Sequence, residues 1–478
     1  MISVIRNGLT KARVPKNIIV VGAGMSGLVA ASLLKEAGHH VTVLEASERV
    51  GGRVYTIRSP FQEGLYLDAG AMRIPNVHYL TLEYIHKFGL PIKPFINSSP
   101  NDLIYVNGIK TRYQDYLRNP DLLRYPVNKR ERGKTVEQLA YYAMDPVIQF
   151  IRKDPEKNWD IAIKQLDSYS LETYLRENPF GRSLSTGAIE MIKVLTAIEG
   201  LPELSFLEVL QEYLILLNPE VRFFEIPGGN DRLPQAFLPL LRGNIHFRHK
   251  MTKILQRKEN VTIQGICTGT KETFSLTGDV AIVTLPFSLL RFVEVVPRNS
   301  FSHEKWKAIR ELHYVSATKI GIQSKSRFWE KEGMFGGKTI TDLPIRFAYY
   351  PSHGIGAPGP AVMLASYTWE DDSLNWESFS DEEAVDQAVK ELAKIYGNQA
   401  FQEFQIGAVQ NWSKDPFSNG AFAMFKPNHQ TDYGAYVATP EGRVHFAGEH
   451  ASTARSWIQG AIESGIRVAV EVNDLPQE

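Results

Sequence analysis

The sequence predicts an α/β protein with an α+β insertion, and three observations support this fold class. Two apolar runs, residues 17–21 and 41–44, flank a segment with helical periodicity, which is the strand–helix–strand pattern of a parallel sheet. Residues 113–218 carry helical periodicity without strand alternation. Residues 311–435 combine apolar strands with one helix, which begins at a capping box at residues 380–383. We therefore expect a parallel-sheet domain, a mixed-sheet domain and a helical subdomain.

Length and composition limit the class of protein. The chain has 478 residues, enough for two or three domains, and a hydrophobic fraction of 43% with a charged fraction of 22% is typical of a soluble globular protein. The 53 basic residues balance the 53 acidic ones, so bulk charge attracts neither nucleic acid nor an anionic membrane. The sequence contains no uncharged apolar run of about 20 residues and no cluster of metal ligands. We expect a small neutral or zwitterionic partner and no nucleic acid, membrane or metal.

Cysteine usage and the N-terminal segment bear on location. The single cysteine, Cys267, cannot form an internal disulfide bond. It ends an expected strand at residues 261–267, where we expect the thiol to be a small core residue. Residues 1–13 lack the apolar segment and cleavage site of a signal peptide. These features favour a cytoplasmic location.

A glycine motif follows the first expected strand. Gly22, Gly24 and Gly27 form a G-x-G-x-x-G sequence that opens the helix, and Glu45 ends the second strand. Gly22 suits a tight turn, Gly24 allows close approach of a pyrophosphate, and Gly27 allows the helix to pack against the strand. Glu45 is placed to accept hydrogen bonds from the adenosine ribose. The motif in this context predicts a Rossmann-like dinucleotide-binding domain.

A second glycine pair distinguishes between dinucleotides. Gly51, Gly52 and Arg53 follow Glu45 closely, and a nicotinamide-binding unit has no use for them. A glycine doublet beside a cation suits a second contact with an extended diphosphate, as in FAD. The alternative is a surface turn with an unrelated arginine.

The C-terminal segment has features that suit the same cofactor. A short strand at residues 443–447 leads to Glu449, which could accept from the ribityl hydroxyls. Residues 456–472 then predict a helix, whose N-terminus near Trp457 could direct its dipole at the flavin. The alternative is an ordinary C-terminal strand–helix unit.

These segments, together with mid-chain segments at residues 226–234 and 279–286, make the nucleotide-binding domain discontinuous. We expect three domains: an FAD-binding domain of residues 14–57, 225–310 and 436–478, a substrate-binding domain of residues 58–112 and 311–435, and a helical domain of residues 113–224.

An arginine follows the glycine doublet. Gly70 and Ala71 permit tight passage of the backbone beneath a flavin, and Arg73 then projects towards the place of a substrate. The planar guanidinium matches a carboxylate. Taken alone, an arginine in a loop is more often part of a surface ion pair.

These motifs together resemble those of the L-amino-acid oxidases of the flavin monoamine oxidase superfamily, and the snake-venom enzymes are similar over almost the full length. The resemblance rests on residues 20–28, 41–49, 70–75, 336–344, 446–450 and 456–458. It implies FAD-dependent oxidative deamination of a free L-amino acid. Molecular oxygen would be the acceptor, and the products would be a 2-oxo acid, ammonia and hydrogen peroxide.

The resemblance also implies roles for individual residues. Arg73 matches the arginine that binds the substrate α-carboxylate, and Tyr367 matches the tyrosine whose hydroxyl contacts the same group. Trp457 matches the aromatic wall near the α-carbon, and Lys319 matches the lysine that holds a water near flavin N5. That lysine could help to deprotonate the ammonium or stabilise charge during reoxidation. The implied substrate pocket also contains Ser456, Trp369 and Ala421.

The implied FAD contacts come from both ends of the chain. They are Gly22, Gly24, Met25, Ser26, Gly27, Glu45, Ala46, Gly52, Arg53, Gly70, Ala71, Met72, Arg73, Met251, Glu449, Ser456, Trp457 and Ile458.

The sequence departs from the relatives at two places. The venom enzymes have a histidine where this chain offers Glu212 or Tyr213, so either the histidine is dispensable or substrate preference differs. Monoamine oxidases attach flavin to a cysteine near the position of Ala421, so here we expect non-covalent FAD. We also expect a homodimer. An amine or polyamine oxidase, an amino-acid 2-monooxygenase and a catalytically silent flavoprotein remain alternatives.

Overall fold

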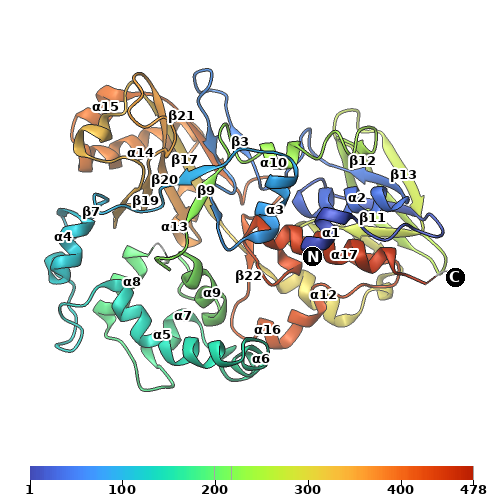
Figure 1. The fold of residues 1–478 in the computed structure, drawn as a ribbon, viewed down its shortest axis with the longest axis horizontal. Coiled ribbons are helices and arrows are strands. Elements are labelled where there is room, and N and C mark those ends of the chain that lie inside the picture. Colours follow the sequence, from blue (N-terminus) through green and yellow to red (C-terminus); the bar gives the residue numbers. More distant parts are fainter. Residues whose placement is uncertain (197, 199, 217, 477–478) are drawn as a thin grey trace.

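The computed structural model describes residues 1–196, 198, 200–216 and 218–476. Residues 197, 199 and 217 of the expected helical domain, and residues 477–478 of the expected FAD-binding domain, lie outside the described residues. The described chain forms two large sheets and a group of helices (Figure 1).

A five-stranded parallel sheet has the strand order β10-β2-β1-β14-β23. Its strands are β1 (Asn17–Val21), β2 (His40–Leu44), β10 (Ile245–His246), β14 (Val280–Val283) and β23 (Val444–Phe446). The N-terminal, central and C-terminal parts of the chain thus meet in one sheet. A parallel sheet must be covered on both faces, which explains the continuous apolar runs of its strands.

Alternate side chains of β1 enter two separate cores. Ile18 and Val20 pack with α2 (Met25–Ala37) and α17 (Ile458–Asn473), which lie against each other on one face. Ile19 and Val21 pack on the other face with a four-stranded sheet. That sheet has the order β13-β12-β11-β15, from Thr273–Gly278, Val261–Cys267, His249–Gln256 and Glu294–Val296. The loops after β1, β2 and β14 therefore lie together at one edge of the sheet, where they line the cavity described below.

A seven-stranded mixed sheet lies beside these layers (Figure 1). Its order is β21-β17-β20-β19-β18-β7-β8, from Phe404–Asn411, Ala317–Ser324, Ala361–Trp369, Phe347–Tyr349, Lys338–Thr341, Leu103–Val106 and Ile109–Arg112. The expected capping box is present, since Ser380 caps α14 (Asp381–Tyr396), and this helix covers β17, β20 and β21.

The helices of the middle of the chain form one group below the seven-stranded sheet in Figure 1. They are α5 (Val136–Lys153), α6 (Pro155–Leu166), α7 (Leu171–Arg176), α8 (Thr186–Leu195) and α9 (Phe206–Leu216). Shorter helices include α1 (Ile2–Asn7), α3 (Tyr79–Lys87), α4 (Tyr113–Arg118) and α12 (His303–Glu311). Of this group, α9 lies nearest the cavity described below, because one of its faces lines that cavity.

Two local expectations were wrong. Cys267 is half-buried at the end of β12 rather than in a core, because the chain turns there into an exposed segment. The C-terminal helix begins at Ile458 and not at residue 456. Ser456 has a left-handed φ of +68°, and its N–H donates to Glu449 at 2.9 Å, so the chain enters the helix only after Trp457.

Candidate active site

A cavity of about 460 Å³ lies at the carboxyl ends of β1, β2 and β14. In parallel α/β sheets, ligands bind at this edge. Its walls include nearly all of the site residues that the sequence indicates. These are Gly22, Gly24, Met25, Ser26, Glu45, Ala46, Gly52, Arg53, Gly70, Ala71, Met72, Arg73, Met251, Lys319, Tyr367, Trp369, Ala421, Glu449, Ser456, Trp457 and Ile458.

Gly27 is the exception, because it does not line the cavity. A Cβ at this position would lie 2.0 Å from the carbonyl oxygen of Gly22. Gly27 therefore permits the close packing of α2 on the β1 loop. By contrast, a Cβ at Gly24 would meet no protein atom within 4 Å. Gly24 thus leaves open space beside the N-terminus of α2, where unpaired N–H groups suit a pyrophosphate.

The acidic residue after β2 is held in place by backbone donors. One oxygen of Glu45 accepts from the N–H of Ala23 at 2.8 Å, and the other accepts from the N–H of Ser47 at 2.8 Å. Glu45 is buried and lines the cavity. The glycine loop and this carboxylate therefore fit the adenosine half of a dinucleotide.

The second glycine pair lies against the first. The N–H of Gly51 donates to the carbonyl of Ala23 at 2.8 Å, and Gly24 pairs with Gly51. Arg53 then crosses to the C-terminal segment, where its Nη1 lies 2.8 Å from Glu449 Oε1. It also donates to the carbonyl of Ala421 at 3.1 Å. Arg53 therefore links segments from the two ends of the chain.

Glu449 has protein donors on both carboxylate oxygens. Arg53 donates to one oxygen and the N–H of Ser456 donates to the other. The N–H of Ala423 lies 3.2 Å from the first oxygen. These contacts fix the Glu449 carboxylate in the cavity wall, between the segments that contain Ala421 and Ser456.

Lys319 is a buried amine on strand β17, which is next to the edge strand of the seven-stranded sheet. Its Nζ donates to the carbonyls of Gly70 at 2.6 Å and Asp68 at 3.1 Å, and it lies 4.5 Å from the centre of the Tyr367 ring. Burial lowers the pKa of Lys319 to about 7. The same burial raises the pKa of Asp68 to about 7. At neutral pH the amine can therefore hold or release a proton next to the loop that contains Gly70.

Arg73 presents its guanidinium to the cavity wall. It donates to Asn97 and to the hydroxyl of Tyr349 at 3.4 Å, and it faces the Phe223 ring at 5.5 Å. Among the residues that the structure describes, no carboxylate forms an ion pair with Arg73. A buried guanidinium without a counter-ion is suited to binding a carboxylate ligand. The sequence reasoning did not find Asn97 or Tyr349, because no local pattern marks them.

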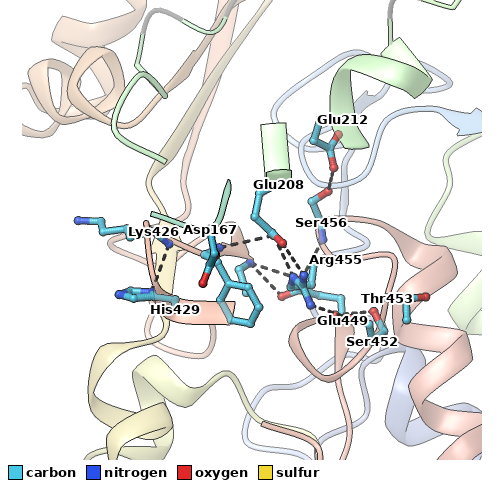
Figure 2. A network of polar contacts seen from close by, with 12 residues as sticks. Asp167, Glu208, Glu212, Lys426, His429, Glu449, Ser452, Thr453, Arg455 and Ser456 are labelled. Carbon is cyan, nitrogen blue, oxygen red and sulfur yellow. Dashed lines mark hydrogen bonds and ion pairs between the residues drawn. The ribbon is translucent and has the colours of Figure 1, made fainter. Parts of the chain in front are cut away.

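Glu212 is a further acidic group in this cavity, on helix α9. It accepts from the hydroxyl of Ser456 and from Trp457 Nε1 at 2.9 Å. Burial, opposed by the hydrogen bonds from Ser456 and Trp457, raises the pKa of Glu212 to about 7; Glu208 adds to this rise and Arg73 acts against it. Figure 2 shows Glu212 directed at Ser456, with Glu208 on the same helix directed at Arg455. The sequence reasoning noted Glu212 only as a departure from the venom enzymes.

Comparison with known proteins identifies the family. The family model described as flavin containing amine oxidoreductase matches residues 25–473. The chain belongs to this family. The prediction of a flavin cofactor is thereby confirmed, and the residues around the cavity fit such a group.

Individual relatives match over nearly the whole chain. The Bacillus subtilis (strain 168) protein YobN is 54% identical over 100% of this chain and 98% of its own length. The L-amino-acid oxidase of Echis ocellatus is 38% identical over 100% and 92%, and that of Siganus canaliculatus is 37% identical over 99% and 88%. The resemblance to L-amino-acid oxidases that the motifs indicated is confirmed.

Solved structures show the same fold. Cyclohexylamine oxidase from Brevibacterium oxydans IH-35A has a TM-score of 0.78 at 20% identity, covering 96% of this chain and 99% of that one. A putrescine oxidase triple mutant has a TM-score of 0.79 at 19% identity, covering 96% and 98%. The predicted α/β fold with mixed-sheet and helical parts is confirmed.

The described residues contain neither a membrane-spanning helix nor a metal-binding cluster. None of the helices there is both long and apolar enough to cross a membrane. Nor does that part of the chain bring together three His, Cys, Asp or Glu side chains that could hold a metal ion.

Proposed function

We propose that this enzyme oxidises free L-amino acids with bound FAD, giving a 2-oxo acid, ammonia and hydrogen peroxide. The observation that carries the proposal is Arg73, a buried guanidinium on the cavity wall without a carboxylate partner among the described residues. A simple amine offers nothing to such a group, whereas an amino acid offers a carboxylate. The L-amino-acid oxidases among the relatives support the same substrate class.

The presence of these residues on the cavity wall supports the following roles. Arg73 and Tyr367 hold the α-carboxylate, and the rings of Trp457 and Trp369 form walls that exclude water. Bound FAD would supply the redox chemistry, namely acceptance of a hydride from the α-carbon and reoxidation by oxygen. Lys319, whose pKa burial lowers to about 7, holds or moves a proton at Nζ. The protein thus supplies orientation and electrostatics to chemistry carried by the cofactor.

The cofactor is proposed to bind through the glycine loop, Glu45, the Gly52–Arg53 segment and the residues before α17, without a covalent bond. The three-domain division given above remains a proposal. A homodimer and a cytoplasmic location are also predictions, which sedimentation analysis and cell fractionation would measure.

The test replaces Arg73 by alanine. Peroxide release from L-phenylalanine should fall by at least about 100-fold in kcat/KM, because the substrate carboxylate loses a charge-assisted, buried partner. The flavin absorbance should remain. Arg118→Ala is the matched control, since that side chain is 75% exposed and does not line the cavity. Equal activity of Arg73→Ala and wild type would remove Arg73 from the substrate site.

The same assay separates the alternatives. Wild-type enzyme should oxidise phenylalanine and leave phenethylamine, which lacks the carboxylate. Comparable rates on both would indicate an amine oxidase, and an amide product would indicate a monooxygenase. If no amino acid in a panel bleaches the flavin under anaerobic conditions, the protein is a silent flavoprotein.

A further inference from the structure

Helix α9 brings two acidic side chains to one face. Glu208 and Glu212 are four residues apart, which places them one above the other on the helix. Glu208 forms an ion pair with Arg455, including a contact of 2.9 Å from Nε. Glu212 lies one turn further on and lines the cavity. The two carboxylates therefore lie on the same helix, but Glu208 is ion-paired and Glu212 lines the cavity.

Glu212 has hydrogen-bond donors but no counter-ion. Its donors, the Ser456 hydroxyl and the Trp457 indole, are both neutral. Within the part of the chain that the structure describes, no lysine, arginine or histidine forms an ion pair with this carboxylate. A desolvated carboxylate without a cation is costly, and a cationic ligand would offset that cost.

Two other charged groups of the cavity wall have partners within the protein. Arg53 is paired with Glu449, and Lys319 donates to two backbone carbonyls. Arg73 and Glu212 remain, one positive and one negative, and each influences the other because Arg73 lowers the pKa of Glu212. The cavity wall thus offers a guanidinium to an anionic group and a carboxylate to a cationic group.

We propose that Glu212 is a specificity residue and that the preferred substrate is an L-amino acid with a cationic side chain, such as ornithine, lysine or arginine. This inference rests on the proposed oxidation of free amino acids. Arg73 holds the α-carboxylate, while Glu212 accepts hydrogen bonds from the side-chain ammonium or guanidinium. The lining near α9 also contains apolar side chains that can cover the methylenes, namely Val209, Leu216, Phe422 and Met424, beside Tyr213.

The α-ammonium is a less suitable partner for Glu212. Transfer of the α-hydrogen requires the amine in its neutral form, and a carboxylate fixed against the α-ammonium would favour the charged form. A carboxylate that pairs instead with the distant end of the side chain has no such effect on the reacting amine.

The experiment compares L-lysine with L-norleucine, which has the same chain without the ammonium. Peroxide release by the purified holoenzyme should give a kcat/KM for lysine at least about tenfold above that for norleucine. Ornithine and arginine should also exceed leucine. Glu212→Gln should lower the lysine-to-norleucine ratio by at least about tenfold. Glu220→Gln, at an exposed position after α9, should leave the ratio unchanged.

Each outcome decides something. If no amino acid releases peroxide, the proposed function itself fails. If norleucine and leucine are oxidised as well as lysine or better, the cationic preference is wrong while the oxidase function stands. If Glu212→Gln lowers both substrates equally, Glu212 acts on the common α-ammonium and the inference is overturned. Glu212→Asp keeps the charge and should retain the preference for lysine. If the glutamine variant loses its flavin, loss of this preference in an aspartate variant that keeps its flavin would overturn the inference.

Discussion

At the scale of single residues, burial brings two groups of opposite charge type to the same pH range. The pKa of Lys319 falls to about 7 and the pKa of Glu212 rises to about 7, in both cases mainly through desolvation. Ionisation of each group therefore changes near neutral pH. Perturbed pairs of this kind are typical of functional sites.

This gives a prediction for pH dependence. Below pH 7 Glu212 is largely protonated and neutral, so it cannot pair with a cationic side chain; above pH 7 it is ionised. The ratio of kcat/KM for lysine over norleucine should therefore rise between pH 6 and pH 8, by roughly tenfold at most. Lys319 acts on both substrates alike, so its titration cancels in the ratio. The other charged groups that act on Glu212 are Glu208 and Arg73.

The control is the same profile for Glu212→Gln, which should be flat. A wild-type ratio that is constant with pH, or that falls as pH rises, would contradict the assignment of the ionised carboxylate to cation binding.

The sequence predicts site residues that match known oxidases, but not the residues that position them. Arg73, Lys319 and Tyr367 could be proposed because each matches a residue with a known role in the oxidases that the chain resembles, and all three line the cavity. Asn97 and Tyr349, which hold Arg73, could not. Tyr349 is 276 positions from Arg73, and only the folded chain brings the two together.

At the scale of elements, the glycines of the first loop have distinct tasks. Gly24 faces open space, whereas Gly27 is packed against the carbonyl of Gly22. Gly24→Ala should leave the melting temperature of the apoprotein unchanged and weaken FAD binding by at least about tenfold, because the added methyl occupies room for the pyrophosphate. Gly27→Ala should instead destabilise the apoprotein by roughly 1–3 kcal/mol through overpacking.

Flavin fluorescence titration and thermal unfolding of both apoproteins measure the difference. Equal FAD affinity in Gly24→Ala and wild type would show that the space beside the helix N-terminus is not used by the cofactor.

The link between α9 and the segment before α17 is a second element-scale feature. Glu208 and Arg455 form a buried ion pair there (Figure 2). Glu208→Gln should reduce the free energy of unfolding by about 3–5 kcal/mol, because it leaves the Arg455 guanidinium buried without its partner. Denaturant unfolding of the holoenzyme measures this loss.

An exposed pair provides the control for that substitution. Glu48 is 73% exposed in its pair with Arg248, so Glu48→Gln should change stability by less than about 1 kcal/mol. A loss for Glu208→Gln that is no larger than this would mean that the buried pair does not stabilise the junction.

The sequence predicts the type of each of these elements better than its boundaries. The parallel strands and α14 appear where apolar runs and the capping box predict them. The start of α17 differs because the N–H of Ser456 donates to the side chain of Glu449, seven positions earlier, and Ser456 has a left-handed φ. Helical propensity contains no information on such a contact.

At the scale of the whole molecule, the cavity depends on segments from both ends of the chain. Strands β1 and β23 belong to one sheet, and Arg53 from the N-terminal part pairs with Glu449 from the C-terminal part. The sequence could predict that both ends contribute because each has glycine and acidic residues at characteristic places. The cavity formed with α9 and β17 could not be derived from local pattern, since its walls are set by packing between distant segments.

A cofactor held between both ends should stabilise the fold and leave when the fold is lost. The only cysteine of the sequence, Cys267, does not line the cavity, so no thiol of the lining is available to attach the flavin. Acid precipitation of the holoenzyme should therefore release all flavin into the supernatant as intact FAD. Added FAD should raise the melting temperature of the apoprotein. At a free FAD concentration of 100 times Kd, the free energy of unfolding should increase by about 2.7 kcal/mol. Flavin that stays with the precipitate would demonstrate a covalent bond, and an unchanged melting temperature would show that FAD does not join the two ends of the chain.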